Sequence, residues 1–535
     1  MKYDYIVIGA GSAGCVVANR LSADKSNSVL LLEAGGRDSN FLIHIPVGFW
    51  RMIDRPSLNW CFKTEPEAGT KDREIPIPRG KVMGGSSSIN GMLYVRGQAA
   101  DYDLWSQLGN RGWSYDEVLP DFKACESFER GENELRGGGG ELNVADMAET
   151  HPVLEAYVEA GGNLGYPTPV DYNGESQEGF GIYQVTQKNG RRHSATCAFI
   201  DPIRGRSNLT ITTRAMVNSV LVNKDRAVAV RYGVRNGQEQ EATCRREIIL
   251  CAGAIQSPQI LELSGIGKRE ILEEHGIPVV KELSGVGENL RDHYSSSVAW
   301  RLKGVGSLNE QTRGWRLVLE SIKWGLLRRG ALTYTAGIAH GFVKTRDDME
   351  NPDVQFHMAH ASYARGKRGA LEQEPGMTIS VCQLRPESTG SVHIKSRNPS
   401  DPPAIRPNFL SETTDRDALI GGMKIARQVG SAEPLSNYVD HEIFPGPNVN
   451  SDEEILEWCR RTGATVFHPV GTCKMGIDEQ AVVDERLRVR GLHGLRVVDA
   501  SIMPTLVSGN TNAPAIMIGQ KGANMILEDN RIASV

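Results

Sequence analysis

The chain has 535 residues, including 60 Lys and Arg against 65 Asp and Glu, and its formal net charge is −5. This length is too great for one ordinary hydrophobic core, so two large domains are expected. The mixed, slightly negative charge and the lack of a basic tail argue against a nucleic-acid partner.

The cysteines and the N-terminal residues predict a cytoplasmic protein. The nine cysteines are scattered and never form a C-x-x-C pair, which is typical of free thiols in a reducing compartment. The first residues, "MKYDYIVIGAGSAG", lead directly into a predicted strand without the apolar core of a signal sequence. No stretch of about 18 uninterrupted apolar residues follows, so no transmembrane helix is expected.

The N-terminal residues predict a βαβ unit. Residues 3–8, "YDYIVI", have the β-branched and aromatic composition of a strand, residues 15–21 have a helical pattern, and residues 28–36 predict a second buried strand. The turn between the first strand and the helix has the sequence "GAGSAG".

Gly9, Gly11 and Gly14 in this turn form the pattern G-x-G-x-x-G, and Glu33 follows Gly14 by 19 residues. The three glycines permit a tight turn, close approach of a pyrophosphate and close packing of helix on strand. The helix N-terminus favours phosphates, and Glu33 can accept hydrogen bonds from ribose hydroxyls. The motif predicts a dinucleotide site but does not distinguish a nicotinamide from a flavin.

The middle of the chain combines loops with strands. Residues 74–92 are rich in Pro, Gly and Ser and predict a functional or disordered loop, and residues 130–142, with four consecutive glycines, predict a flexible lid or connection. Residues 209–234 alternate apolar and polar side chains, which predicts antiparallel strands. Longer helical patterns over residues 309–460 favour a second domain, and residues 495–527 resemble the first domain again.

Six ordered segments resemble the glucose–methanol–choline (GMC) oxidoreductase family, flavoproteins that oxidise alcohols. They are the N-terminal glycine motif, "PRGKVMGGSSSINGMLYVRG" (78–97), "GAIQSPQILELSGIG" (253–267), "GVGENLRDH" (285–293), "HPVGTCKMG" (468–476) and "VVDASIMPTLVSGNTNAPAIMI" (497–518). The resemblance implies an α+β fold with a Rossmann-like FAD-binding domain and a second, substrate-binding domain with an antiparallel sheet and helices. The implied boundaries are 1–158, 200–308 and 464–535 for the FAD-binding domain, and 159–199 and 309–463 for the substrate-binding domain.

The resemblance also implies which residues bind FAD. Ile89 occupies the position of the histidine that members with covalent FAD carry, so noncovalent FAD is expected, and no metal site is expected. The implied cofactor-binding residues are Gly9, Gly11, Ser12, Ala13, Gly14, Glu33, Ala34, Arg79, Gly80, Val82, Gly84, Gly85, Ser86, Asn90, Gly91, Val217, Ala252, Gly253, Asp499, Ala500 and Asn510.

His468 and Asn512 match the catalytic positions of the family. Oxidation of an alcohol by hydride transfer requires removal of the hydroxyl proton, for which an imidazole is suited, and an asparagine amide can stabilise the developing charge on the oxygen. Cys473 and Met475 lie close to His468, but one cysteine and one histidine without further ligands do not make a zinc site, so we expect them to pack behind the turn. Of the other histidines, His340, His357 and His360 remain candidates for lining the substrate pocket.

Residues 43–49 and 181–195 look most like bacterial aliphatic-alcohol, polyethylene-glycol and sorbose dehydrogenases. A primary alcohol, long-chain or polymeric, is therefore favoured as the substrate, with a quinone or another non-oxygen electron acceptor. Choline is the second candidate, and an oxygen-using alcohol oxidase is less favoured. Within the same fold, His468 argues against a photodecarboxylase, and His468 with Asn512 argues against a noncatalytic FAD-binding protein.

Residues 313–330, "RGWRLVLESIKWGLLRRG", combine Trp, Leu and Ile with five arginines and lysines. This pattern is typical of a basic amphipathic helix at a membrane surface, and a surface helix of the substrate-binding domain is the alternative. Peripheral contact with the inner membrane therefore stays open, as does the oligomeric state, for which a dimer is one alternative.

Overall fold

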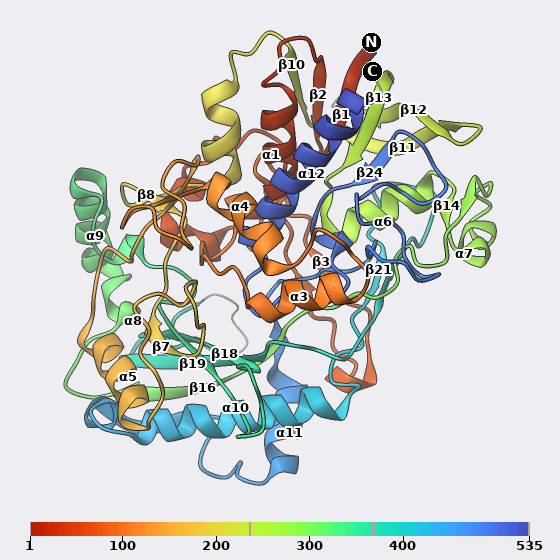
Figure 1. The fold of residues 1–535 in the computed structure, drawn as a ribbon. Coiled ribbons are helices and arrows are strands. Elements are labelled where there is room, and N and C mark those ends of the chain that lie inside the picture. The colour runs from red at the N-terminus through yellow and green to blue at the C-terminus, as the bar shows by residue number, and fades with distance from the viewer. Residues whose placement is uncertain (1, 235–236, 365–369, 533–535) are drawn as a thin grey trace.

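The computed structural model describes residues 2–234, 237–364 and 370–532. Within these residues the strands form two large sheets of seven strands each, accompanied by helices (Figure 1). Each sheet belongs to its own cluster of buried apolar side chains. The α+β class predicted from the sequence is confirmed.

The first sheet has a parallel centre. Its strands are β1 (Lys2–Ile8), β2 (Val29–Glu33), β10 (Leu209–Thr213), β11 (Met216–Asn223), β12 (Arg226–Gly233), β13 (Glu239–Leu250) and β24 (Leu495–Val497). The order is β10-β2-β1-β13-β12-β11, and β24 pairs with the C-terminal end of β13. All neighbours pair in parallel except β13 with β12 and β12 with β11.

The register of the parallel strands brings predicted cofactor-binding segments together. Ile8 of β1 pairs with Leu32 of β2 on one side and with Leu250 of β13 on the other. These three strands therefore end at the same edge of the sheet, with Gly9 and Gly253 just beyond it. The carboxyl edge of parallel strands is where open α/β sheets bind ligands.

β10 differs from the sequence prediction for residues 209–234. β11 and β12 form the expected antiparallel hairpin, but β10 pairs in parallel with β2. An alternating pattern predicts which side chains of a strand face the core. It does not predict which strand pairs with it or in which direction, because both depend on the path of the chain. The pattern therefore predicted the strand but not its direction of pairing.

The second sheet is antiparallel throughout. Its strands are β7 (Gly179–Ile182), β16 (Tyr294–Leu302), β17 (Ala339–Val343), β18 (Val354–Ala359), β19 (Gly376–Gln383), β22 (Val439–Phe444) and β23 (Ala464–Thr465). The order is β22-β16-β19-β18-β17-β7, and β23 pairs with the start of β16. The long helix α10 (Thr413–Ser431) packs on β16 and β19, and α5 (Pro152–Asn163) packs on β7 (Figure 1).

The C-terminal helix returns the chain to the first sheet. α12 (Asn512–Ile532) packs against α1 (Ser12–Leu21), and the two chain ends lie together in Figure 1. A Cβ on Gly519 would lie 2.7 Å from the carbonyl oxygen of Ala13, so a glycine at this position permits the close approach of the two helices.

The predicted domain boundaries stay a prediction, to which we propose one change. β16 and residues 152–158 of α5 fall in segments assigned to the FAD-binding domain, yet β16 pairs within the antiparallel sheet. Apolar side chains of α5 also belong to the cluster around that sheet. We therefore propose that the substrate-binding domain includes both elements.

Shorter elements complete the fold. The remaining α-helices are α2 (Phe41–His44), α3 (Ala99–Gln107), α4 (Tyr115–Cys125), α6 (Gly253–Leu263), α7 (Arg269–Glu274), α8 (Leu308–Gln311), α9 (Gly314–Leu327) and α11 (Asp452–Thr462). The remaining strands have two or three residues and are β3 (Phe62–Lys63), β4 (Pro76–Ile77), β5 (Glu126–Phe128), β6 (Leu142–Val144), β8 (Gln187–Lys188), β9 (Arg191–Arg192), β14 (Ile266–Gly267), β15 (Lys281–Glu282), β20 (Ser391–His393) and β21 (Ala404–Arg406).

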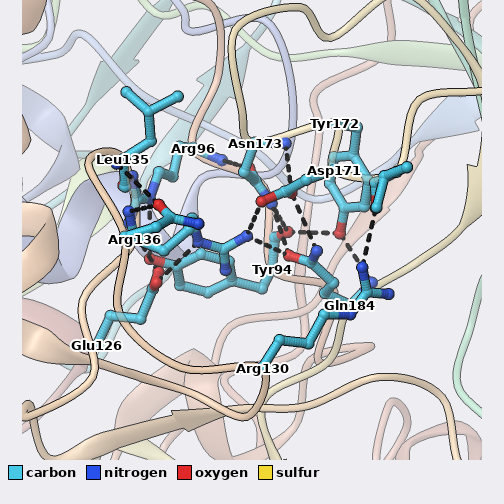
Figure 2. Close-up of polar contacts among 12 residues, drawn as sticks. Tyr94, Arg96, Glu126, Arg130, Leu135, Arg136, Asp171, Tyr172, Asn173 and Gln184 are labelled. Carbon is cyan, nitrogen blue, oxygen red and sulfur yellow. Dashed lines mark hydrogen bonds and ion pairs between the residues drawn. The ribbon is translucent and has the colours of Figure 1, made fainter.

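A buried ion-pair network fixes the glycine-rich loop over residues 130–142. Figure 2 shows the ion pairs that Arg96 and Arg136 both form with Glu126. Their N–O distances are 2.9 Å and 2.8 Å. Arg136 also contacts Asp171 at 2.7 Å. The side chains of Arg136 and Glu126 are fully buried. The loop connects β5 and β6, as one of the two predicted alternatives had it, but its centre is anchored by Arg136 and is not a flexible lid.

Replacing Glu126 by Gln should destabilise the fold by about 3–5 kcal/mol, because two buried guanidinium groups lose their shared counter-charge. The exposed pair of Lys63 and Glu74, at 2.8 Å, provides the matched control. Urea unfolding followed by circular dichroism should show a clear shift for Glu126→Gln and an unchanged midpoint for Glu74→Gln. Equal shifts for both variants would contradict a stabilising role for the network.

Candidate active site

A cavity of about 500 Å³ lies where the two sheets meet. Ser295 of β16, His357 of β18 and Ser380 of β19 line it from the second sheet, opposite the carboxyl edge of the first sheet. Of the site residues predicted from the sequence, those that line this one cavity are Gly9, Gly11, Ser12, Ala13, Glu33, Ala34, Arg79, Gly80, Gly85, Ser86, Asn90, Gly91, Val217, Ala252, Gly253, His468, Asp499, Ala500, Asn510 and Asn512.

The other three predicted residues shape the cavity from behind. A Cβ on Gly14 would lie 1.9 Å from the carbonyl oxygen of Gly9, so only glycine lets the first helix pack this closely. Gly84 has a φ of 86° and donates its N–H to the carbonyl of Ala10 at 2.7 Å. Val82 is fully buried.

Small residues line the cofactor end of the cavity. A Cβ on Gly85 would lie 2.7 Å from the Cα of Gly11, so the loop over residues 80–91 lies directly on the N-terminal glycine turn. Glu33 accepts from the N–H groups of Ala10 at 2.9 Å and Gly35 at 2.7 Å. Burial raises the pKa of Glu33 to about 7. Together these features fit a dinucleotide cofactor, with the pyrophosphate at the glycine turn and the ribose at Glu33.

Arg192, which the sequence analysis did not single out, holds the loop over residues 80–91. Its guanidinium donates to the side-chain oxygen of Asn90 at 2.6 Å, to the carbonyl of Asn90 at 2.7 Å and to the carbonyl of Ser87 at 3.1 Å. Burial lowers the pKa of Arg192 to about 9. These donors fix the carbonyl groups and turn the small residues of the loop toward the cavity.

The turn that carries His468 is held by a buried carboxylate. Asp292 accepts from the N–H of His468 at 2.8 Å and from the hydroxyl of Thr465. Phe467 has a φ of 71°, a conformation that a bulky residue rarely adopts. Burial raises the pKa of Asp292 to about 6. These contacts fix the backbone of His468 independently of the hydrogen bonds that its ring makes.

The ring of His468 belongs to a chain of hydrogen bonds that fixes its tautomer. The Nε2 atom of His293 lies 2.9 Å from the carbonyl oxygen of Leu384, and the Nδ1 atoms of His293 and His468 are 2.9 Å apart. Because a carbonyl only accepts, Nε2 of His293 carries the proton, and burial lowers the pKa of His293 to about 4, which keeps the ring neutral. Nδ1 of His293 therefore accepts from Nδ1 of His468, which leaves the lone pair of His468 on Nε2.

Asn510 faces this lone pair. Its side-chain N–H₂ lies 3.1 Å from Nε2 of His468, and its side-chain oxygen accepts from Gln355 at 3.1 Å, which fixes the orientation of the amide. Burial, with smaller repulsion from His293, His357 and Arg79, lowers the pKa of His468 well below its usual value. A neutral, acceptor nitrogen thus faces the cavity beside an amide donor.

The side chain of Asn512 contacts the N-terminal glycine turn. Asn512 begins α12, and its side-chain oxygen accepts from the hydroxyl of Ser12 in the N-terminal glycine turn at 2.7 Å. Asn510, which the sequence analysis placed among the cofactor-binding residues, is the asparagine that contacts His468. We therefore propose that Asn510 takes the role predicted for Asn512 beside His468 and that Asn512 acts at the cofactor site, since positions two residues apart at the start of a helix point in different directions.

The other histidines and the residues beside His468 differ in whether they line the cavity. His357 lines the cavity, whereas the cavity lining contains neither His340 nor His360 among the described residues. Cys473 and Met475 are buried in the apolar cluster of the first sheet, which confirms the prediction that they pack behind the turn. The sequence analysis missed Asp292 and His293, although they are the last two residues of the segment "GVGENLRDH", which carries part of the family resemblance.

Comparisons with known proteins agree with this geometry. GMC oxidoreductase family profiles match residues 3–295 and 386–519. An alcohol dehydrogenase [acceptor] of Pseudomonas putida is 42% identical over all of this chain and 97% of its own length. The mitochondrial choline dehydrogenase of Homo sapiens is 41% identical over 98% of this chain and 90% of its own length. The crystal structure of pyridoxine 4-oxidase from Mesorbium loti has a TM-score of 0.89 and 30% identity, with 98% of each chain covered.

The chain belongs to the GMC oxidoreductase family, as the sequence motifs predicted. It is an enzyme of the FAD-dependent alcohol oxidoreductase class within that family. In the part of the chain that the structure describes, none of the helices combines the length and the apolar character needed to cross a bilayer.

The contacts of the two asparagines predict different defects. Asn510→Ala removes the donor beside Nε2 of His468, so we expect retained flavin and alcohol-driven flavin reduction slowed by about 10²-fold. Asn512→Ala removes the acceptor of the Ser12 hydroxyl at the glycine turn, so we expect weaker flavin retention and a nearly normal reduction rate in the loaded enzyme. Flavin content by absorbance and stopped-flow reduction measure both effects, and the reverse pattern would contradict the exchange of roles.

Proposed function

We propose that this enzyme oxidises a neutral primary alcohol to the aldehyde and passes the electrons to a quinone or another non-oxygen acceptor. The observation that carries the proposal is the lone pair on Nε2 of His468, which faces a cavity also lined by the cofactor-binding residues. FAD bound in that cavity would supply the acceptor for the hydride of the alcohol carbon.

His468 removes the hydroxyl proton in this proposal. Its Nε2 atom is free of a proton at neutral pH because the pKa of the ring is lowered, so it is ready to accept one. When the ring becomes an imidazolium, its Nδ1–H still donates to His293, so the orientation of the ring does not change. Asn510 can donate to the alcohol oxygen as negative charge develops there.

The charges around the cavity favour a neutral substrate. In the described residues, the carboxylates that line it are Glu33 and Asp499. Both are engaged at the cofactor end: Glu33 accepts from the glycine turn, and Asp499 accepts from the N–H of Gly253 at 2.9 Å and from the hydroxyl of Ser257 at 2.6 Å. The charged side chain that bears on His468 is Arg79, a cation. Asp292, which holds the turn of His468, is not among the described residues that line the cavity, so a quaternary ammonium group would meet Arg79 without a lining carboxylate near the reacting hydroxyl.

Apolar side chains in the cavity lining suit an aliphatic or polymeric substrate chain. Phe49, Trp50, Ile53 and Ala336 line the cavity, and Ala336 packs in the same apolar cluster as Phe49 and Trp50. Burial of methylene groups against such side chains contributes to binding without a need for charge. An alkanol or a polyether alcohol therefore fits the proposal.

Choline is the second candidate, which two observations support. Aromatic rings can bind quaternary ammonium groups by cation–π contact, and Phe49 and Trp50 both line the cavity, with their centroids 4.6 Å apart. Choline dehydrogenases of Homo sapiens and Escherichia coli are also similar to this chain over nearly its whole length. Choline is the less favoured substrate because the described residues that line the cavity near His468 include no carboxylate.

We also propose that FAD is bound noncovalently and that the enzyme is cytoplasmic. The side chain of Ile89 lines the cavity and carries no nucleophile with which to form a bond to the cofactor. Acid precipitation of the holoenzyme therefore leaves the flavin in the supernatant under this proposal.

Anaerobic mixing of the holoenzyme with different alcohols tests the substrate class. Primary alkanols or polyethylene glycol should bleach the flavin absorbance, whereas choline at equal concentration should reduce it at least tenfold more slowly. His468→Ala should retain the flavin but reduce it about 10²- to 10⁴-fold more slowly, because the proton acceptor is lost. Faster flavin reduction by choline than by the neutral alcohols would show that the substrate is choline. If none of the alcohols reduced the flavin, the proposal of alcohol oxidation itself would be wrong.

A further inference from the structure

The helix α9 is unusual because its large apolar side chains are exposed. Of the thirteen exposed large apolar residues in the described part of the chain, six lie on this helix of 14 residues, and none of its residues is buried. Figure 1 shows α9 at the edge of the molecule, away from both sheets. The six side chains are Trp315 (69% exposed), Val318 (57%), Leu319 (53%), Ile322 (52%), Leu326 (79%) and Leu327 (67%).

The exposed apolar side chains gather on one side of α9. Trp315, Val318, Ile322 and Leu326 are spaced by three or four residues, so they form one stripe along the helix. In an ordinary surface helix such a stripe faces the core, but here it faces solvent.

The opposite side of α9 is attached to the protein. Trp324 donates its indole N–H to the carbonyl of Gly190 at 2.8 Å, and Glu320 accepts from the N–H of Ala331 at 2.6 Å. These contacts come from the side that holds the less exposed residues of the helix. The apolar stripe is therefore held outward by specific contacts and does not result from a detached helix.

Basic side chains lie on one flank of the stripe, at Arg316 and Lys323, and at both ends of the helix. Arg313, Arg316, Lys323, Arg328 and Arg329 lie on α9 or within two residues of its ends. The acidic groups that face this segment are Glu320, which accepts from the backbone of Ala331, and Glu149, which accepts from the N–H of Gly330 at 2.8 Å and lies 3.9 Å from Lys323. The segment is thus a local positive surface on a chain with a net charge of −5.

We propose that α9 docks on an anionic lipid bilayer and lies flat in its interface. An exposed apolar stripe with basic side chains on one flank and at its ends matches acyl chains below anionic headgroups. At about 21 Å the helix is shorter than the roughly 30 Å of a bilayer core, so it lies along the surface. A second copy of the chain is a poorer occupant, because a two-fold contact along α9 would place its arginines and Lys323 against their own copies.

The position of α9 connects the bilayer to the cavity. The helix contacts the 3₁₀ helix η6 (Ala331–Thr333), which contacts η1 (Pro46–Arg51), and η1 contains the cavity-lining Phe49 and Trp50. Docking would therefore hold this side of the enzyme against lipid, where apolar alcohols and quinones concentrate. The link between docking and access to apolar alcohols and quinones rests on the proposed function, whereas docking itself does not.

Flotation of the purified holoenzyme with vesicles tests the docking. The wild-type enzyme should float with vesicles of equal parts phosphatidylcholine and phosphatidylglycerol, and at least tenfold less with pure phosphatidylcholine. The variant Trp315→Gln/Ile322→Gln/Leu326→Gln and the variant Arg316→Glu/Lys323→Glu should each lose at least tenfold of the binding to anionic vesicles. Ile477→Gln, which changes an equally exposed apolar residue (67%) outside α9, should bind as the wild type does.

Two further measurements separate docking from the alternatives. All these variants should retain flavin and its reduction by a water-soluble primary alcohol, so a failure of the substrate proposal would leave the flotation result intact. Absence of wild-type flotation with anionic vesicles, or equal loss in Ile477→Gln, would overturn the proposal. A dimer by analytical ultracentrifugation that dissociates in the triple Gln variant, without vesicle binding, would assign α9 to self-association instead.

Discussion

The site depends on one chain of buried hydrogen bonds, which runs from the carbonyl of Leu384 through His293 to His468 and Asn510. Every member of the chain has a fixed direction of donation, because the carbonyl at one end only accepts and the amide at the other end is oriented by Gln355. The chain determines which nitrogen of His468 carries the lone pair. It therefore decides whether the ring can accept a proton from a molecule in the cavity.

Both sheets are needed to build this chain. His293 immediately precedes β16, and Leu384 immediately follows β19, so the second sheet holds one end. His468 and Asn510 come from the C-terminal part of the chain, which returns to the first sheet through β24 and α12. The cofactor-binding residues lie at the carboxyl edge of that first sheet. The meeting of the sheets therefore brings the proton acceptor to the cofactor, and the buried Asp292 sets the turn between them.

Local patterns predicted much of this structure. The glycine turn with Glu33 required only a short strand, a turn and a helix in sequence, and the outward stripe of α9 is visible from the spacing of its apolar and basic residues. The family resemblance identified His468, and nearly all of the site residues that it implied line the cavity. These features depend on neighbours in the chain or on motifs that the family shares.

Other features depend on contacts between distant segments. Asn510 and Asn512 are chemically equivalent in sequence, and only the packing of α12 on the glycine turn separates their partners. The parallel pairing of β10 and the anchoring of the glycine-rich loop by Arg136 likewise depend on partners far away in the chain. His293 has no sequence pattern that marks it as the residue that fixes the tautomer of another histidine.

The most direct test of this account is the pH dependence of the limiting rate of anaerobic flavin reduction by a saturating primary alcohol. Burial, with smaller contributions from His293, His357 and Arg79, lowers the pKa of His468, so the ring stays free of a proton as the pH falls through the ordinary histidine range. The account predicts a constant rate in stopped-flow measurements from about pH 9 down to about pH 6. A rate that falls with a midpoint near the ordinary value of about 6.5 would contradict it.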